Sequence, residues 1–96
     1  MIEILMSKET EDFLKQKGSH YVIKLTVMGS GWCKTLQPTV KVGKPTNTEN
    51  FEVIEKNELT FYLSKDCYSP SKKISIELKG FWLFKNIELK GIKGRF

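Results

Sequence analysis

Apolar and polar residues alternate with a period of two through much of this chain, which is the pattern of strands that bury one face. In the first such run, residues 21–28, the side chains of Ile23, Leu25 and Val27 share one face. The same alternation recurs later in the chain, at residues 36–43, 51–56, 59–64 and 74–78. The pattern therefore predicts a domain that is rich in short strands.

Turn-forming residues and prolines refine this pattern. Residues 51–56 and 59–64 flank a turn at Asn57, and together they predict a hairpin. Pro38 cannot donate a hydrogen bond to a ladder, so it predicts an edge strand or a bulge at the start of its strand. Residues 1–5 alternate loosely and predict a further short edge strand.

A short helix is predicted before the first long strand. Ser7 is well placed as its N-cap, and acidic residues follow it while lysines come later, as the helix dipole favours. Phe13 and Leu14 lie on the narrow apolar stripe that would dock the helix. Gly18 is expected to end the helix by adopting a left-handed conformation.

The length of 96 residues bounds the architecture, because a chain of this size buries roughly 65% of its extended surface and leaves little for a second core. We therefore expect residues 1–96 to form a single domain. Its predicted class is α+β, with one N-terminal helix and about seven short, mostly antiparallel strands in two sheets that curl over one core.

Cysteine usage and hydropathy predict the compartment. Two cysteines, Cys33 and Cys67, are too few for the disulfide framework of a secreted mini-domain. No window offers the ~20 uninterrupted apolar residues of a membrane span. Residues 1–6 lack the basic leader and cleavage site of a signal peptide. A cytoplasmic protein with reduced thiols and no membrane contact is expected.

The net charge of +5 comes from lysines that are dispersed along the chain, and Arg95 is the only arginine. Recognition of nucleic acid relies on arginine forks and on a concentrated patch, so the lysines are interpreted as a solubility feature. Phe81, Trp82 and Phe84 could form a stacking platform for bases, but we expect them to be core residues, since no arginine flanks them. Nucleic acid is therefore not an expected partner.

The candidate site is a glycine-flanked turn, Met28-Gly29-Ser30-Gly31-Trp32-Cys33-Lys34. Gly29 and Gly31 permit the positive backbone angles of a tight, exposed tip, on which Cys33 could act as a nucleophile or metal ligand. The alternative is that Cys33 is a small buried residue at the start of a strand. Trp32 could be a lid or an anchor for a partner, or it could belong to the core.

The second thiol, Cys67, lies in a loop whose polar neighbours predict exposure. Cys33 and Cys67 lack the C-x-x-C spacing of a zinc or thioredoxin motif, so one subunit cannot complete a tetrahedral thiolate site. Two subunits could do so by supplying two sulfurs each. His20 has no second histidine, and the carboxylates and glycines match no catalytic motif, so no catalytic residue is assigned.

The chain arranges its features in a definite order. A short helix begins near Ser7, a strand ends in Gly29-x-Gly31-x-Cys33, and a further strand, the hairpin and a closing Gly80-Phe81-Trp82-Leu83-Phe84-Lys85-Asn86 follow. From about residue 4 to about residue 86, this order resembles the HesB-like domain of A-type iron–sulfur cluster carriers. The resemblance implies a HesB-like curled two-sheet fold.

The HesB-like resemblance also implies ligands. In that family a cysteine in the glycine turn and a Cys-Gly-Cys near the C-terminus ligate iron or a cluster, usually shared across a dimer. Cys33 matches the first of these ligands. Thr35 stands where a glycine normally follows, and residues 87–96 contain no cysteine. The family's usual ligand set is therefore incomplete in this chain.

The chain is still more similar to a small group of HesB-like proteins of anaerobic bacteria, whose turn carries adjacent cysteines or a cysteine beside selenocysteine. A redox or metal role is supposed for that group. Here Trp32 and Cys33 occupy the turn, so the pair is reduced to one thiol.

Three hypotheses follow for the function. The leading one is a non-enzymatic HesB-like thiol protein that uses Cys33 to hold iron, another metal or an iron–sulfur cluster transiently, within a homodimer and in exchange with an iron–sulfur partner protein. The second is a redox protein in which Cys33 is oxidised or exchanges disulfides with a partner, with Cys67 as the resolving thiol if the fold brings the two together. The third is a degenerate structural or interaction domain that keeps only the scaffold.

Overall fold

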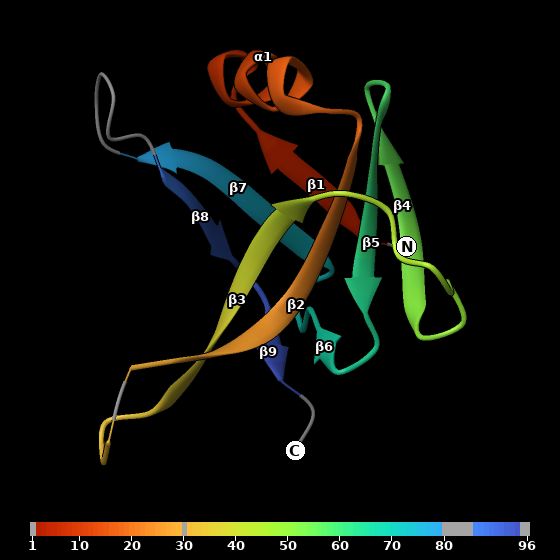
Figure 1. Cartoon of the computed structure of the whole chain (residues 1–96). Coiled ribbons are helices and arrows are strands. Elements are labelled where there is room, and N and C mark those ends of the chain that lie inside the picture. Colours follow the sequence, from red (N-terminus) through yellow and green to blue (C-terminus); the bar gives the residue numbers. More distant parts are fainter. Residues whose placement is uncertain (1, 30, 80–85, 95–96) are drawn as a thin grey trace.

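Strands make up most of the computed structural model, which describes residues 2–29, 31–79 and 86–94 (Figure 1). One helix, α1 (Lys8–Lys17), follows the first strand. The described strands are β1 (Glu3–Met6), β2 (His20–Met28), β3 (Thr35–Val42), β4 (Phe51–Lys56), β5 (Leu59–Ser64), β6 (Cys67–Tyr68), β7 (Lys73–Lys79), β8 (Asn86–Lys90) and β9 (Lys93–Gly94).

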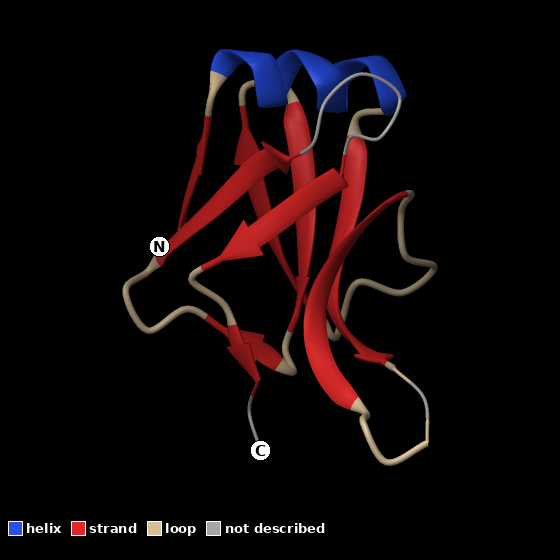
Figure 2. Ribbon diagram, turned by 90° about the vertical axis from the view of Figure 1, so that its left-hand side faces the viewer, coloured by secondary structure: helices blue, strands red, loops and turns tan. Residues whose placement is uncertain are grey.

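The described strands form three sheets. The largest has the order β3-β2-β5-β4, a second has the order β1-β7-β8, and β6 pairs with β9. Two pairs, β1 with β7 and β2 with β5, are parallel, and the other pairs are antiparallel. In both views α1 lies across one end of the strands (Figures 1 and 2).

The predicted α+β, HesB-like fold class is wrong, because the domain is mainly β. Its ten-residue helix covers only an end of the sheets and forms no helical layer of its own. The strands also form a third, two-stranded sheet and two mixed sheets, which the two-sheet prediction lacked. The error has a physical source: periodicity identifies the strands, but the parallel pairs join segments that are far apart in sequence.

The helix itself is confirmed. The Ser7 hydroxyl caps it by accepting a hydrogen bond of 3.2 Å from the Thr10 backbone N–H. Leu14 is buried in the core, Phe13 packs against that core, and the Tyr21 hydroxyl donates a hydrogen bond of 2.5 Å to the Leu14 carbonyl. Gly18 ends the helix, but its backbone is extended and not left-handed as predicted; a side chain there would overlap Val42.

Glu11 joins the helix to the turn of the β4–β5 hairpin. Its carboxylate is buried, accepts a hydrogen bond from the Asn57 amide and lies 3.5 Å from the Lys8 ammonium and 3.8 Å from that of Lys15. The Asn57 hydrogen bond is the main reason that the pKa of Glu11 is below its ordinary value, and the two lysines lower it further. This contact positions α1 over the hairpin.

The strand predictions for the hairpin and the edges are confirmed. β4 and β5 pair in register from Phe51↔Ser64 to Lys56↔Leu59, across a turn in which Asn57 and Glu58 have positive φ. β1 and β3 are edge strands, as residues 1–5 and Pro38 indicated. The expectation that Phe81, Trp82 and Phe84 belong to the core lies outside the described residues.

The core lies between the four-stranded sheet, the β1-β7-β8 sheet and α1. Its buried members are Ile4, Leu14, Tyr21, Ile23, Ile54, Leu59, Phe61, Leu63, Cys67, Ile74 and Ile76. These side chains anchor the first half of β2, whereas its second half extends beyond the core. Within the described residues, no helix is both long enough and apolar enough to cross a membrane.

Candidate functional site

The candidate turn lies at the tip of a two-stranded ribbon, residues 25–38, which we call the β2–β3 arm. β2 pairs with β5 only from His20 to Ile23, but it pairs with β3 as far as Met28↔Thr35. Beyond Ile23, none of the described ladders pairs a third strand with these two strands. In both views the ribbon projects from the end of the molecule opposite α1 (Figures 1 and 2).

The backbone of the turn requires its two glycines. Gly29 and Gly31 have φ values of 98° and 60°, in the region that side chains disfavour. A Cβ added at Gly29 would overlap the carbonyl oxygen of Cys33, whereas one at Gly31 would meet open space. Gly29 thus lets the two sides of the turn approach each other, and the prediction of positive angles at both glycines is confirmed.

The turn exposes the side chains of Trp32 and Cys33. Cys33 is an exposed free thiol, so the alternative that it is buried at a strand start is wrong. Trp32 has a relative exposure of 104%, which excludes the core alternative. Its role as a partner anchor stays a prediction. An exposed indole next to an exposed thiol can contact another molecule before the sulfur reacts with it.

Cys67 lies in the opposite kind of environment. It is only 3% exposed, because β6 pairs with β9 and the side chain packs into the core, so the predicted exposure is wrong. Burial raises the pKa of the Cys67 thiol, Asp66 raises it further, and a hydrogen bond from the Leu25 backbone N–H partly offsets both effects. The residues next to Cys67 in the sequence are polar, but this polarity does not predict the exposure of Cys67 itself.

The two sulfurs are too far apart to bridge. Cys67 contacts the backbone of Leu25, whereas Cys33 lies opposite Gly29 at the tip of the arm. Leu25 and Gly29 are separated by roughly 13 Å, since a strand rises about 3.3 Å per residue. A disulfide requires Cα atoms within about 7 Å of each other. Cys67 therefore cannot act as an intramolecular resolving thiol while the arm keeps this structure.

The side chains of the described residues do not form a site in which a single chain could hold a metal ion or a cluster. Among them there is no group of three or more histidine, cysteine, aspartate or glutamate side chains that could hold an ion. Cys33 offers one exposed sulfur, and a second copy would add only one more, because Cys67 is buried. A four-coordinate thiolate site needs more ligands than these.

The comparisons with known proteins identify the family of this thiol-bearing domain. The chain matches the CC/Se motif containing family over residues 2–92. The chain belongs to the CC/Se motif containing family. Comparison with curated proteins and with solved structures gave no match. This finding confirms the predicted membership of a small Cys/Sec motif family, whereas the HesB-like part of the resemblance stays a prediction that the mainly β fold does not support.

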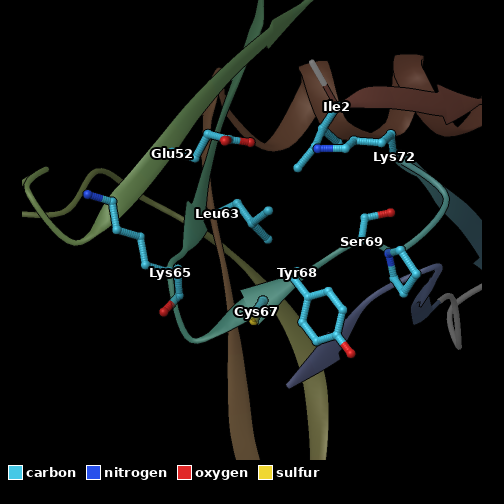
Figure 3. Close-up of a pocket in the computed structure, with 10 residues that line it drawn as sticks. Ile2, Glu52, Leu63, Lys65, Cys67, Tyr68, Ser69 and Lys72 are labelled. Atoms are coloured by element: carbon cyan, nitrogen blue, oxygen red, sulfur yellow. The ribbon is translucent and has the colours of Figure 1, made fainter. Parts of the chain in front are cut away.

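A pocket that the sequence did not indicate lies beside Cys67 in this CC/Se motif family member (Figure 3). It has a volume of about 600 Å³, and its walls come from Ile2, from β4 and from the segment between the end of β5 and the start of β7. Its charged lining residues are Glu52, Lys65 and Lys72. These residues are separated in sequence and carry no shared motif, so no local signal could have predicted the pocket.

We expect the two thiols to differ sharply in alkylation. In the native protein, iodoacetamide should modify Cys33 readily and Cys67 about a hundredfold or more slowly, because Cys33 is exposed and Cys67 is only 3% exposed. Mass spectrometry of peptides from native and denatured samples measures this. Equal labelling of both cysteines in the native state would contradict the burial of Cys67.

Proposed function

We propose that this CC/Se motif family member is a non-enzymatic thiol protein whose Cys33 exchanges disulfides with another protein. The observation that carries the proposal is the contrast between the thiols: Cys33 is exposed at the tip of the β2–β3 arm, and Cys67 is buried in the core. An exposed thiol on a projecting tip can reach a bond within another molecule. The other thiol of its own chain, Cys67, is buried.

The proposed step balances without an external oxidant. The Cys33 thiolate attacks one sulfur of a disulfide in the partner protein, and a new S–S bond forms between them. The partner's S–S bond breaks, and its second sulfur leaves with the electron pair and then takes up a proton. Because Cys67 cannot resolve the mixed disulfide, a thiol of the partner or of a third molecule must release Cys33.

This proposal is favoured over metal binding and over a scaffold without chemistry. Among the described residues no group of ligating side chains gathers around Cys33, and two copies would expose only two thiols where a four-coordinate thiolate site needs four. A scaffold alone gives no reason for a turn that exposes a thiol next to a fully exposed indole, since burial of both would stabilise the fold.

Exchange with glutathione disulfide tests the proposal. The wild-type protein and Cys67→Ala are expected to form one glutathione adduct per chain at similar rates, because the reacting sulfur is the same. Cys33→Ser should form adducts about a hundredfold or more slowly, if at all. Intact mass against time measures the rates, and circular dichroism checks that both variants fold.

The outcomes separate the hypotheses cleanly. A wild-type protein that forms no adduct would leave the interaction domain as the better account. Adduct formation by Cys33→Ser at the wild-type rate would place the reactive sulfur at Cys67 and overturn the assignment of Cys33.

A further inference from the structure

The β2–β3 arm carries more apolar surface than the exposure of one thiol requires. Val27 and Leu36 are paired across the two strands, so their side chains lie on the same face of the arm. Their relative exposures are 59% and 46%, and Trp32 at the tip is fully exposed. Together these three residues offer an apolar contact surface beside Cys33 that the described part of the chain leaves uncovered.

The backbone of the arm also has a free edge. The Ser19 carbonyl accepts a hydrogen bond of 2.9 Å from Thr60 at the start of β5, and the His20 carbonyl accepts one of 2.8 Å from Gly43 at the end of β3. Because successive backbone groups of a strand point to opposite sides, odd-numbered residues of β2 face the β5 side.

Val27 is the next residue of β2 whose backbone N–H and C=O face this edge, and at Val27 the edge is free to pair with another strand. β5 pairs with β2 only through Ile23↔Leu63, and Cys67 occupies the position beside Leu25. Within the described ladders no strand pairs with Val27 on that side. Its N–H and C=O can therefore pair with an extended segment from another chain.

The charge around the arm determines what kind of segment fits. Residues 13–48 contain six lysines and no aspartate or glutamate. Three of these lysines, Lys24, Lys34 and Lys41, are exposed on or next to the arm and form no ion pair with any described residue. Residues 13–48 thus contribute lysines and no carboxylate to the surface around Cys33, and this positive charge would attract an acidic segment and repel a basic one.

We infer that the β2–β3 arm docks an acidic, extended segment of a partner protein, which pairs with the edge at Val27 and covers the apolar surface of Val27, Leu36 and Trp32. The inference rests on the proposed function, because the segment brings the partner's disulfide to Cys33. A second copy of this chain fits less well, since two arms would bring the same lysines together. A nucleic acid would leave the strand edge unpaired.

Two synthetic peptides test this inference. Both carry one cysteine as a mixed disulfide with glutathione, in an extended sequence of the same length and apolar content, flanked in one by glutamates and in the other by lysines. The glutamate peptide is expected to react with Cys33 about tenfold to a hundredfold faster at low salt. In 1 M salt, where the Debye length is about 3 Å, the difference should fall below about threefold.

Variants of the arm separate docking from simple thiol reactivity. Lys34→Glu and Trp32→Ala should each slow the glutamate peptide by about threefold or more relative to the rate of the same variant with 2-hydroxyethyl disulfide, a small uncharged disulfide whose rate reports any change in the Cys33 thiol itself. The matched controls Lys65→Glu and Val53→Ala, which are exposed but lie outside the arm, should change neither rate.

A binding measurement that involves no reaction tests the inference even if the Cys33 thiol proves unreactive. In the Cys33→Ser protein, a glutamate peptide with serine in place of cysteine should shift the amide signals of residues 25–38 in NMR spectra. Failure of both exchange reactions with peptide binding intact would overturn the proposed function alone.

Equal rates for the two peptides, with glutathione disulfide still reacting, would overturn the docking inference alone. Two further findings would also overturn it: a stable homodimer with the arm at its interface, or a single-stranded oligonucleotide that binds the arm more tightly than the glutamate peptide does.

Discussion

Replacing Phe61 by alanine is expected to lower the free energy of unfolding by about 3–5 kcal/mol, because the substitution leaves a cavity in the centre of the core. Phe61 is fully buried in β5, pairs in register with Tyr21 of β2 and Ile54 of β4, and stacks on the Tyr21 ring with centroids 6.0 Å apart. Urea unfolding followed by circular dichroism measures the change, and the loss is large relative to the stability of a small domain.

The same substitution should affect the two thiols differently. The root of the arm is held by the contact of Tyr21 with Phe61, so a weaker core should open more often and expose Cys67. Alkylation of Cys67 is expected to accelerate in Phe61→Ala, whereas Cys33 should react as before, because it is already exposed.

A control on the neighbouring strand distinguishes loss of core packing from a general effect of removing apolar atoms. Val53→Ala on β4, where the side chain is half exposed, should change the free energy of unfolding by no more than about 0.5 kcal/mol. A comparable loss in Val53→Ala and Phe61→Ala would contradict the position of the core.

Local chemistry was sufficient to predict most elements of this fold. The Ser7 cap, the apolar stripe at Leu14 and the Asn57 turn are each decided by residues within a few positions of one another. Pro38 is a further case: it lies opposite Leu25, whose N–H points away from β3, so the nitrogen of Pro38 faces the outer edge, where no ladder bond is lost.

The overall topology depended on contacts that periodicity does not encode. β1 and β2 each form a parallel pair with a later strand, and this arrangement places β6 beside β2. Cys67 is buried because β6 also pairs with β9 and the side chain packs into the core, although its sequence neighbours are polar. The alternating pattern predicted which face each strand buries, but not which strand lies next to it.

Only part of the candidate site could be predicted from the sequence, because only part of it depends on residues that are close together in the chain. The glycines around Cys33 indicated an exposed turn, because positive φ is a local requirement. The projection of the arm was not predictable, since it follows from the point at which β5 stops pairing with β2, after Ile23↔Leu63. Site residues that depend on one turn can thus be found in the sequence, whereas those that depend on strand pairing cannot.

Gly29→Ala is expected to disorder the tip of the arm while leaving the core folded. Alanine at φ 98° is strained, and its Cβ would overlap the backbone carbonyl of Cys33, which no side-chain rotation can relieve. We expect a cost of about 1–3 kcal/mol, which corresponds to a loss of about tenfold to a hundredfold in hydrogen-exchange protection at Thr26. Its amide faces β3 within the arm, so exchange measured by NMR detects the opening directly.

Gly31→Ala is the matched control, because a Cβ there meets no atom and only the positive φ of 60° opposes it. Its cost should be about 1 kcal/mol, and protection at Thr26 should fall by less than in Gly29→Ala. Val22, which lies where β2 is held on both sides, should keep its protection in both variants. If Gly29→Ala and Gly31→Ala proved equally mild, the close approach of Gly29 to Cys33 could not be what shapes the turn, and another constraint would have to hold the thiol at the tip.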